Sequence, residues 1–225
     1  LLTPSKKAKV LIDKDYIMSL YGEMKESMVY GSRLVLKRKI STSIFSKEIK
    51  IEDIVDNLEP SDEEFMLLYH FNFGYPLLDE DSFIIKPKAN IYPRTTEDKE
   101  DIKNCLNMTV PIDSNDEKCF FHDNKSDSEG WAYVGLINKR LNLGAYLKYK
   151  MESLPILLEW KSMRSHDYTV GIEPGNSYVM GRVEERKNKT LPKIKGYSQI
   201  KHELILGMLD GAEEINSFEK LMSSI

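Results

Sequence analysis

Residues 33–42 read RLVLKRKIST, a run in which β-branched and other apolar residues mix with charged ones. Such mixing is typical of an antiparallel strand with one solvated face. Similar runs lie close to it on both sides and are separated by short turns: Lys9–Tyr16, Met18–Met28 and Lys47–Val55. No helical pattern of roughly ten to fifteen residues, the length that a crossover helix needs, comes between them. The pattern therefore predicts an all-β sandwich or barrel and argues against βαβ units.

The second half of the chain continues this pattern. Further strands are expected at Lys118–His122, Gly130–Asn138, Leu143–Lys150, Ile156–Lys161 and Tyr168–Glu173. Residues 200–209 fit a strand or a helix, and we favour a strand because Gly207 weakens a helix interior. A short helix is expected at Ala212–Met222. The strand pattern predicts a single domain over residues 1–225.

Three segments depart from simple alternation. Residues 64–78 read EFMLLYHFNFGYPLL and form the most continuous apolar run, which predicts a strand buried on both faces. Residues 86–116 are polar and contain three prolines, which predicts a long surface excursion. Residues 182–195 carry many basic side chains, and we expect a hairpin or loop there.

Composition and charge narrow the classes of function. The chain has 225 residues, of which 41% are hydrophobic and 30% charged, and its net charge is -4. A negative net charge gives no general attraction to nucleic acid or to anionic lipid. No apolar stretch approaches the roughly twenty residues that span a bilayer, and residues 1–7 lack the order of a signal peptide. We therefore expect a cytoplasmic protein that binds neither nucleic acid nor membranes.

The cysteines and the short motifs give no sign of redox or metal chemistry. Cys105 and Cys119 lie outside any CxxC pattern and are expected to be reduced thiols. The sequence has no HExxH, P-loop, GxGxxG or GxSxG motif, so we expect neither a metal nor a cofactor. The chain begins at Leu1 without a methionine, and we expect the full-length protein to have further N-terminal strands.

Strand alternation directs attention to His70 in the apolar run. One face of the predicted strand changes from apolar to polar along its length and comprises Met66, Leu68, His70 and Asn72. The polar end must meet water, a partner group or a ligand. A core histidine that bonds to a neighbouring carbonyl explains His70 equally well.

A carboxylate ends the last strand before a turn. Gly171 and Glu173 share one face of the predicted strand, opposite Val170 and Ile172. Gly171 removes side-chain bulk and would open room for a substrate beside Glu173. An exposed glutamate at a strand end is the ordinary alternative.

An acid, an aromatic ring and a base follow one another at residues 159–161. Alternation places Glu159 and Lys161 on one face, opposite Leu158 and Trp160. These residues form either a solvated face or a sugar site, in which an apolar ring stacks beside hydrogen-bonding groups. His122 presents the same two alternatives.

Five segments resemble a family of aldose-1-epimerase-like proteins, the domain-of-unknown-function 4432 group. They are residues 51–57, 68–78, 157–161, 170–176 and 209–215, and they occur in the order typical of the family. Through this family the chain is similar to the galactose mutarotases. The resemblance implies a large antiparallel β-supersandwich and a sugar as the small-molecule ligand.

The resemblance also implies roles for individual residues. His70 matches the mutarotase general acid, and Glu173 matches the general base. Residue chemistry agrees, because anomer interconversion needs one group to take a proton from the C1 hydroxyl and another to protonate the ring oxygen. Residues expected to contact substrate are Asn72, Tyr75, His122, Glu159, Lys161 and Asn176, with Trp160 or Tyr75 stacking on the ring. The alternatives are a non-catalytic carbohydrate-binding protein, or a lyase or glycosidase that uses Glu159 as its second carboxylate.

Overall fold

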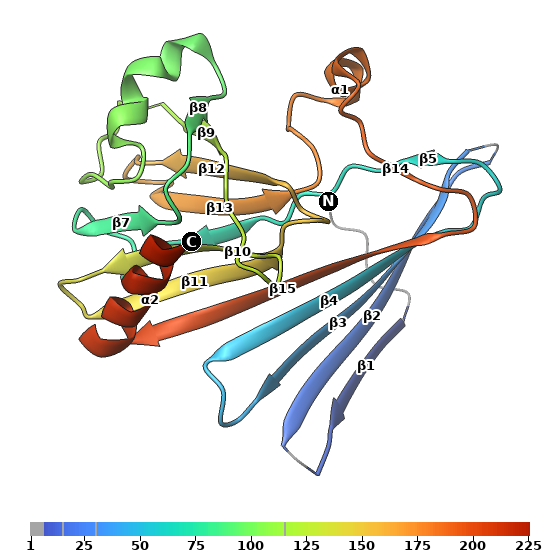
Figure 1. Cartoon of the computed structure of the whole chain (residues 1–225), viewed down its shortest axis with the longest axis horizontal. Coiled ribbons are helices and arrows are strands. Elements are labelled where there is room, and N and C mark those ends of the chain that lie inside the picture. The colour runs from blue at the N-terminus through green and yellow to red at the C-terminus, as the bar shows by residue number, and fades with distance from the viewer. Residues whose placement is uncertain (1–6, 15, 30, 115) are drawn as a thin grey trace. The chain divides into compact units, whose positions relative to one another are not determined.

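The computed structural model describes residues 7–14, 16–29, 31–114 and 116–225, which divide into two compact units. The first unit contains residues 7–67 and 177–206, and the second contains Leu68–Asn176 and Gly207–Ile225. Strand β15 (Gln199–Asp210) contributes residues to both. Because one strand is shared, the two units are not separate stretches of the chain, and the expectation of a single domain stays a prediction. Figure 1 shows the elements of each unit.

Four long antiparallel strands form most of the first unit. In order across the sheet they are β1 (Lys7–Ile12), β2 (Ile17–Ser27), β3 (Arg33–Ser43) and β4 (Glu48–Asn57), and β15 follows β4. Alternation is clearest in β4, where every second residue from Ile51 to Asn57 is buried. All four strands were predicted from the sequence, and their ends differ by a few residues.

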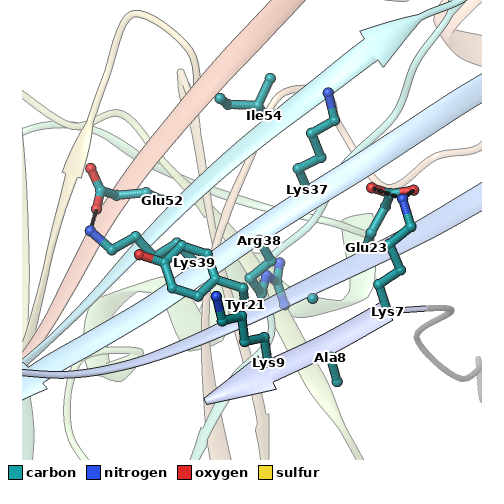
Figure 2. A pocket seen from close by; sticks show the side chains of 11 residues that line it. Lys7, Ala8, Lys9, Tyr21, Glu23, Lys37, Arg38, Lys39, Glu52 and Ile54 are labelled. Carbon is teal, nitrogen blue, oxygen red and sulfur yellow. Dashed lines mark hydrogen bonds and ion pairs between the residues drawn. The ribbon is translucent and has the colours of Figure 1, made fainter. Parts of the chain in front are cut away.

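The two faces of this sheet differ in character. On one face the register aligns Lys9, Tyr21, Lys39 and Glu52 across the four strands. Lysine side chains rise on both sides of the Tyr21 ring there and border a shallow hollow (Figure 2). On the other face, Asp53 is fully buried and accepts hydrogen bonds from the Arg38 guanidinium, with Nε to Oδ1 at 2.8 Å. In β4 one face is therefore solvated and the other buried, as the mixed composition of residues 33–42 predicts for the sheet. Burial decreases towards β1: Val10 and Leu20, which align with Ile40 and Ile51 on the Asp53 side, are exposed.

The prediction of a hairpin or loop at residues 182–195 was wrong. The segment forms helix α1 (Arg182–Asn188) and strand β14 (Lys193–Ile194), which pairs with β5 (Glu63–Glu64). Glutamates in the first turn of α1 and basic residues in its last turn complement the helix dipole. This charge order was present in the sequence, but the helix spans only about two turns and gives little apolar periodicity.

The second unit holds two sheets and the C-terminal helix. Five strands follow the order β6 (Phe71–Phe73), β13 (Thr169–Gly175), β12 (Ile156–Ser162), β9 (Lys118–His122) and β8 (Ile91–Pro93). The other sheet continues from β15 through β11 (Leu143–Lys150), β10 (Trp131–Asn138) and β7 (Ser82–Ile85). Helix α2 (Ala212–Ser224) packs Phe218 against Tyr146 of β11, with ring centroids 5.3 Å apart. The expected C-terminal helix and the strand at residues 200–209 are both confirmed.

The apolar run at residues 64–78 is not the continuous buried strand that we expected. Only its first residue, in β5, and the three residues of β6 are strand, and β6 is the last strand of its sheet. His70, Asn72 and Tyr75 are exposed. Unbroken apolar composition cannot separate a two-sided strand from short segments joined by irregular chain, and Gly74 and Pro76 interrupt the ladder here.

The polar segment at residues 86–116 is more ordered than a surface excursion. It contains β8 and the 3₁₀ helix η1 (Thr96–Asn104). Cys105 and Met108 are buried, and both cysteines of the chain are free thiols. Isolated apolar residues among polar neighbours therefore anchor this segment in the unit.

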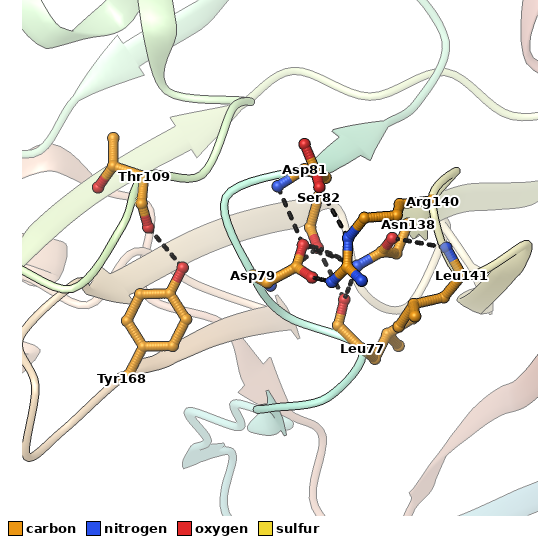
Figure 3. A network of polar contacts seen from close by, with 9 residues as sticks. All are labelled: Leu77, Asp79, Asp81, Ser82, Thr109, Asn138, Arg140, Leu141 and Tyr168. Carbon is orange, nitrogen blue, oxygen red and sulfur yellow. Dashed lines mark hydrogen bonds and ion pairs between the residues drawn. The ribbon is translucent and has the colours of Figure 1, made fainter.

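The loop after β6 is held by a buried polar network around Asp79 (Figure 3). Asp79 Oδ1 accepts hydrogen bonds from Asn138 Nδ2 at 2.7 Å and from the Asp81 backbone N–H at 2.9 Å. Oδ2 is paired with Arg140. Burial acts to raise the pKa of Asp79, but the hydrogen bonds from Asn138, Arg140 and the Asp81 backbone outweigh it, and the pKa is lowered. The network fastens this loop to the turn between β10 and β11.

Candidate active site

The candidate site lies on one face of the five-stranded sheet. Residues directly opposite each other in antiparallel strands point to the same side. The register pairs Gly171 of β13 with Trp160 of β12 and with Asn72 of β6, and it pairs Glu173 with Leu158. Because alternate residues share a side, these five residues all lie on one face, which we call the Glu173 face.

His70 stands against Glu173 just before β6 begins. Its Nε2 atom lies 2.9 Å from Oε1 of Glu173. The His70 side chain is 47% exposed, whereas that of Glu173 is only 2% exposed. Among the described residues, Oε1 of Glu173 accepts no well-aligned hydrogen bond, so the contact is a close approach between a base and an imidazole. The strand register thus brings a buried carboxylate and an accessible imidazole together.

Burial raises the pKa of Glu173 to about 7, because the carboxylate loses its hydration. A carboxyl group that titrates near neutral pH can take up and release a proton there, which is what a general base requires. Protonated His70 would act in the opposite direction, since a cation 2.9 Å away favours the carboxylate.

Gly171 provides the room that the Glu173 carboxylate occupies. A Cβ atom on Gly171 would lie 2.4 Å from Oε1 of Glu173 and 3.2 Å from Oδ1 of Asn72. The first separation is far below van der Waals contact. The sequence predicted open space beside Glu173, and the structure shows the carboxylate itself folded over the glycine, with Asn72 bordering the same space.

Trp160 completes the Glu173 face near His70. The two rings meet with their centroids 5.8 Å apart and their planes at 63°. The indole N–H of Trp160 donates a hydrogen bond of 3.0 Å to Oε2 of Glu117. Sequence reasoning missed Glu117, because it lies just before β9 among other charged residues and has no distinguishing spacing.

His122, Glu159 and Lys161 lie on the opposite face of the same sheet. Glu159 pairs in register with Ile172, and Lys161 pairs with Val170, so both point away from Glu173. All three are buried, and His122 Nε2 lies 2.9 Å from Oε2 of Glu159. Lys161 Nζ lies 3.4 Å from Oε1 of Glu159. The structure therefore does not bring these three residues together with His70 and Glu173.

The remaining expected substrate contacts are near the ends of strands. Tyr75 is 80% exposed in the loop after β6. Asn176 directly follows β13 and is half-buried. Within the described part of the chain, no group of three or more His, Cys, Asp or Glu side chains is placed to hold a metal ion, and no helix has the length and hydropathy of a membrane span.

A known family model matches most of the chain. A family model described as a domain of unknown function, DUF4432, matches residues 2–208. The chain belongs to the DUF4432 family. The family named from the sequence motifs is thereby confirmed. No curated protein matches this DUF4432 chain.

Solved structures show the same fold. A candidate aldose 1-epimerase from Klebsiella pneumoniae is 24% identical with a TM-score of 0.92, over 97% of this DUF4432 chain and 57% of that protein. A galactose mutarotase-like protein from Clostridium acetobutylicum is 17% identical with a TM-score of 0.63, over 90% of this chain and 65% of that one. The chain thus spans less than two thirds of each of these proteins. The all-β, galactose mutarotase-like sandwich expected from the sequence is confirmed.

Proposed function

We propose that this protein is an aldose 1-epimerase-like isomerase that interconverts the anomers of a hexose or a hexose derivative. One observation carries the proposal: a buried base, Glu173, and an accessible acid, His70, stand 2.9 Å apart on one sheet face. The mutarotase-like fold of the solved neighbours supports it. The two free, buried thiols support a reducing compartment, and we place the protein in the cytoplasm.

In the proposed reaction Glu173 takes the proton from the anomeric hydroxyl while His70 donates one to the ring oxygen. The C1–O1 bond becomes a carbonyl, the bond between C1 and the ring oxygen breaks, and its electron pair stays on that oxygen. Rotation about C1–C2 exposes the other face of the aldehyde. The ring closes with the two proton transfers reversed, so both residues return to their starting states.

Substrate must enter between the two groups, because 2.9 Å leaves no space for a sugar hydroxyl between them. His70 is the group that can move, since its side chain is half exposed while Glu173 is enclosed. Asn72 borders the space over Gly171 and is suited to bind a sugar hydroxyl. Tyr75 and Asn176 are proposed as outer contacts of the same sugar.

We propose a structural role for the residues on the opposite side of the sheet from the Glu173 face, here called the rear face. His122, Glu159 and Lys161 are buried behind the Glu173 face and are proposed to stabilise the sheet that carries it. A glycosidase needs two carboxylates flanking one bond. Glu159 and Glu173 lie on opposite faces of the sheet and cannot flank one bond. This pair of carboxylates therefore gives the glycosidase alternative no support.

The test is polarimetry of freshly dissolved α-aldoses, free and phosphorylated, with the full-length protein and its Glu173→Gln and His70→Asn variants. We expect the wild-type protein to accelerate relaxation of the optical rotation for at least one sugar, and both variants to lose most of that acceleration. If wild type and Glu173→Gln relax every sugar at the same rate while a sugar still binds in calorimetry, the protein is a carbohydrate-binding protein and the proposal is wrong.

A further inference from the structure

Trp160 and His70 meet over the strand that lies between them. β12 carries Trp160, and β6 follows directly after His70; both strands flank β13. Strands separated by one neighbour are about 10 Å apart, yet the centroids of these two rings are only 5.8 Å apart. Both side chains therefore lean across β13. Gly171, the β13 residue opposite Trp160, has no side chain to keep them apart.

The indole is held from its far edge. Its N–H donates to Oε2 of Glu117 at 3.0 Å, and Trp160 itself is partly buried. A ring fixed at one edge by a hydrogen bond and packed against a sheet has few alternative rotamers. Trp160 thus presents a defined surface to the imidazole.

His70 has more freedom than the other groups of the site. Its side chain is 47% exposed, and a half-exposed imidazole outside a regular strand can adopt several rotamers. Glu173 limits the position of Nε2, and Trp160 limits the tilt of the ring plane, at 63° to its own. Before substrate enters, the two contacts together set the position and the tilt of the acid. Once substrate separates His70 from Glu173, the contact with Trp160 is the one that can still orient the imidazole.

We propose that Trp160 is a positioning residue that orients the His70 imidazole on the Glu173 face, with Glu117 fixing the indole. The contact itself is independent of any activity, while its catalytic consequence rests on the proposed function. This assignment replaces the expected stacking of Trp160 on a sugar ring. The T-shaped contact with His70 occupies part of the indole.

The contact can be tested by fluorescence without any substrate. The chain has two tryptophans, so a Trp131→Phe background leaves Trp160 as its single indole. A protonated imidazole close to an indole quenches its emission. We expect emission to fall when His70 becomes protonated, and His70→Asn to abolish this part of the pH dependence.

The effects of other titratable groups near the indole must be distinguished from that of His70. These groups are Glu173, Glu117 and Cys119, which stands opposite Trp160 and receives a contact from Arg94. Glu173→Gln and Glu117→Gln, each in the Trp131→Phe background, measure how much these two carboxylates contribute to the pH dependence of the emission. If the quenching step persists unchanged in His70→Asn, the rings are not in contact and the proposal is wrong.

Activity then distinguishes positioning from sugar stacking. We expect Trp160→Leu to lower kcat about 10- to 100-fold with little change in KM. Trp160→Phe should recover only part of the loss, because it keeps a ring but lacks the N–H that bonds to Glu117. A rise in KM with kcat unchanged would show that Trp160 binds sugar, and would overturn the proposal. If no sugar is turned over, the proposed function fails, while the fluorescence result still decides the contact.

Discussion

Glu159 and Glu173 lie on adjacent antiparallel strands, yet their carboxylates are on opposite faces of the sheet. Glu173 stands opposite Leu158, and Glu159 stands opposite Ile172, so the register places the two acids one residue out of phase. The polar cluster of Glu159 is buried on one side of the sheet, and the His70 contact lies on the other. One sheet thus separates a pair suited to proton transfer from a set of charges enclosed behind it.

Mutarotation should depend on the ionisation of Glu173. The base must be deprotonated to accept the anomeric proton, and burial raises its pKa to about 7. We therefore expect kcat/KM to rise as pH increases through about 7 and then to level off on that limb of the profile. Polarimetric rates measured from about two pH units below this pKa to about two units above it, roughly pH 5 to 9, give the profile. A limb that survives in Glu173→Gln would assign the titration to another group.

The same group should affect folding stability. The folded pKa of Glu173, about 7, lies above the ordinary value of 4.5, so the folded state holds its proton more tightly than the unfolded chain. Stability is therefore expected to fall as pH rises from about 4.5 to 7, by at most about 3 kcal/mol. Glu173→Gln cannot ionise and should lose this decline in urea titrations. Equal pH dependence in both proteins would contradict the burial argument.

Gly171→Ala should disable the site without unfolding the sheet. The new Cβ would lie 2.4 Å from Oε1 of Glu173, so the carboxylate must leave its position over the strand. We expect a loss of kcat of about 100-fold, because misplacing a reacting group by about 1 Å has effects of that size. Gly74→Ala is the matched control: its Cβ would come no closer than 3.9 Å to the Tyr168 carbonyl oxygen. Equal activity of the two variants would show that the carboxylate has room elsewhere.

The sequence predicted the strands and the faces of this site better than it predicted burial. Two-residue alternation correctly placed Gly171 with Glu173, and Glu159 with Lys161, because alternation is local. It could not show that Lys161 is buried, since the carbonyl groups that compensate its charge come from residues more than 50 positions away. The proximity of His70 to Glu173 likewise depends on the pairing of β6 with β13, which are about a hundred residues apart, and only the family resemblance linked them.

Asp79 should contribute stability that disappears in acid. Its pKa is lowered below 3.8 by Asn138, Arg140 and the Asp81 backbone, so the charged form is stabilised in the folded state. That contribution is present above the unfolded pKa and is lost as pH falls through the folded one. We expect Asp79→Asn to cost about 1–3 kcal/mol at pH 7, and the gap to narrow at lower pH. Asp81→Asn, which alters a half-exposed partner of Arg140, is the control and should cost much less.

Removal of Lys161 should destabilise the fold and leave substrate binding intact. Lys161 donates to the backbone carbonyls of Cys105 and Asn107 and stands 3.4 Å from Glu159. Lys161, Glu159 and Cys105 are buried. Lys161→Met would leave the buried Glu159 charge without its cation, at a cost of about 3–5 kcal/mol. Exposed Lys88 provides the control, Lys88→Met, which should be nearly neutral.

Combination with Glu159→Gln decides whether the two charges act as a pair. Once the carboxylate is neutral, loss of the lysine leaves no uncompensated buried charge, so the double variant should be more stable than the sum of the single effects predicts. Urea denaturation followed by circular dichroism measures all three variants. If Lys161→Met instead folds normally and raises the KM for a sugar, Lys161 reaches substrate, and the rear face is part of the binding site.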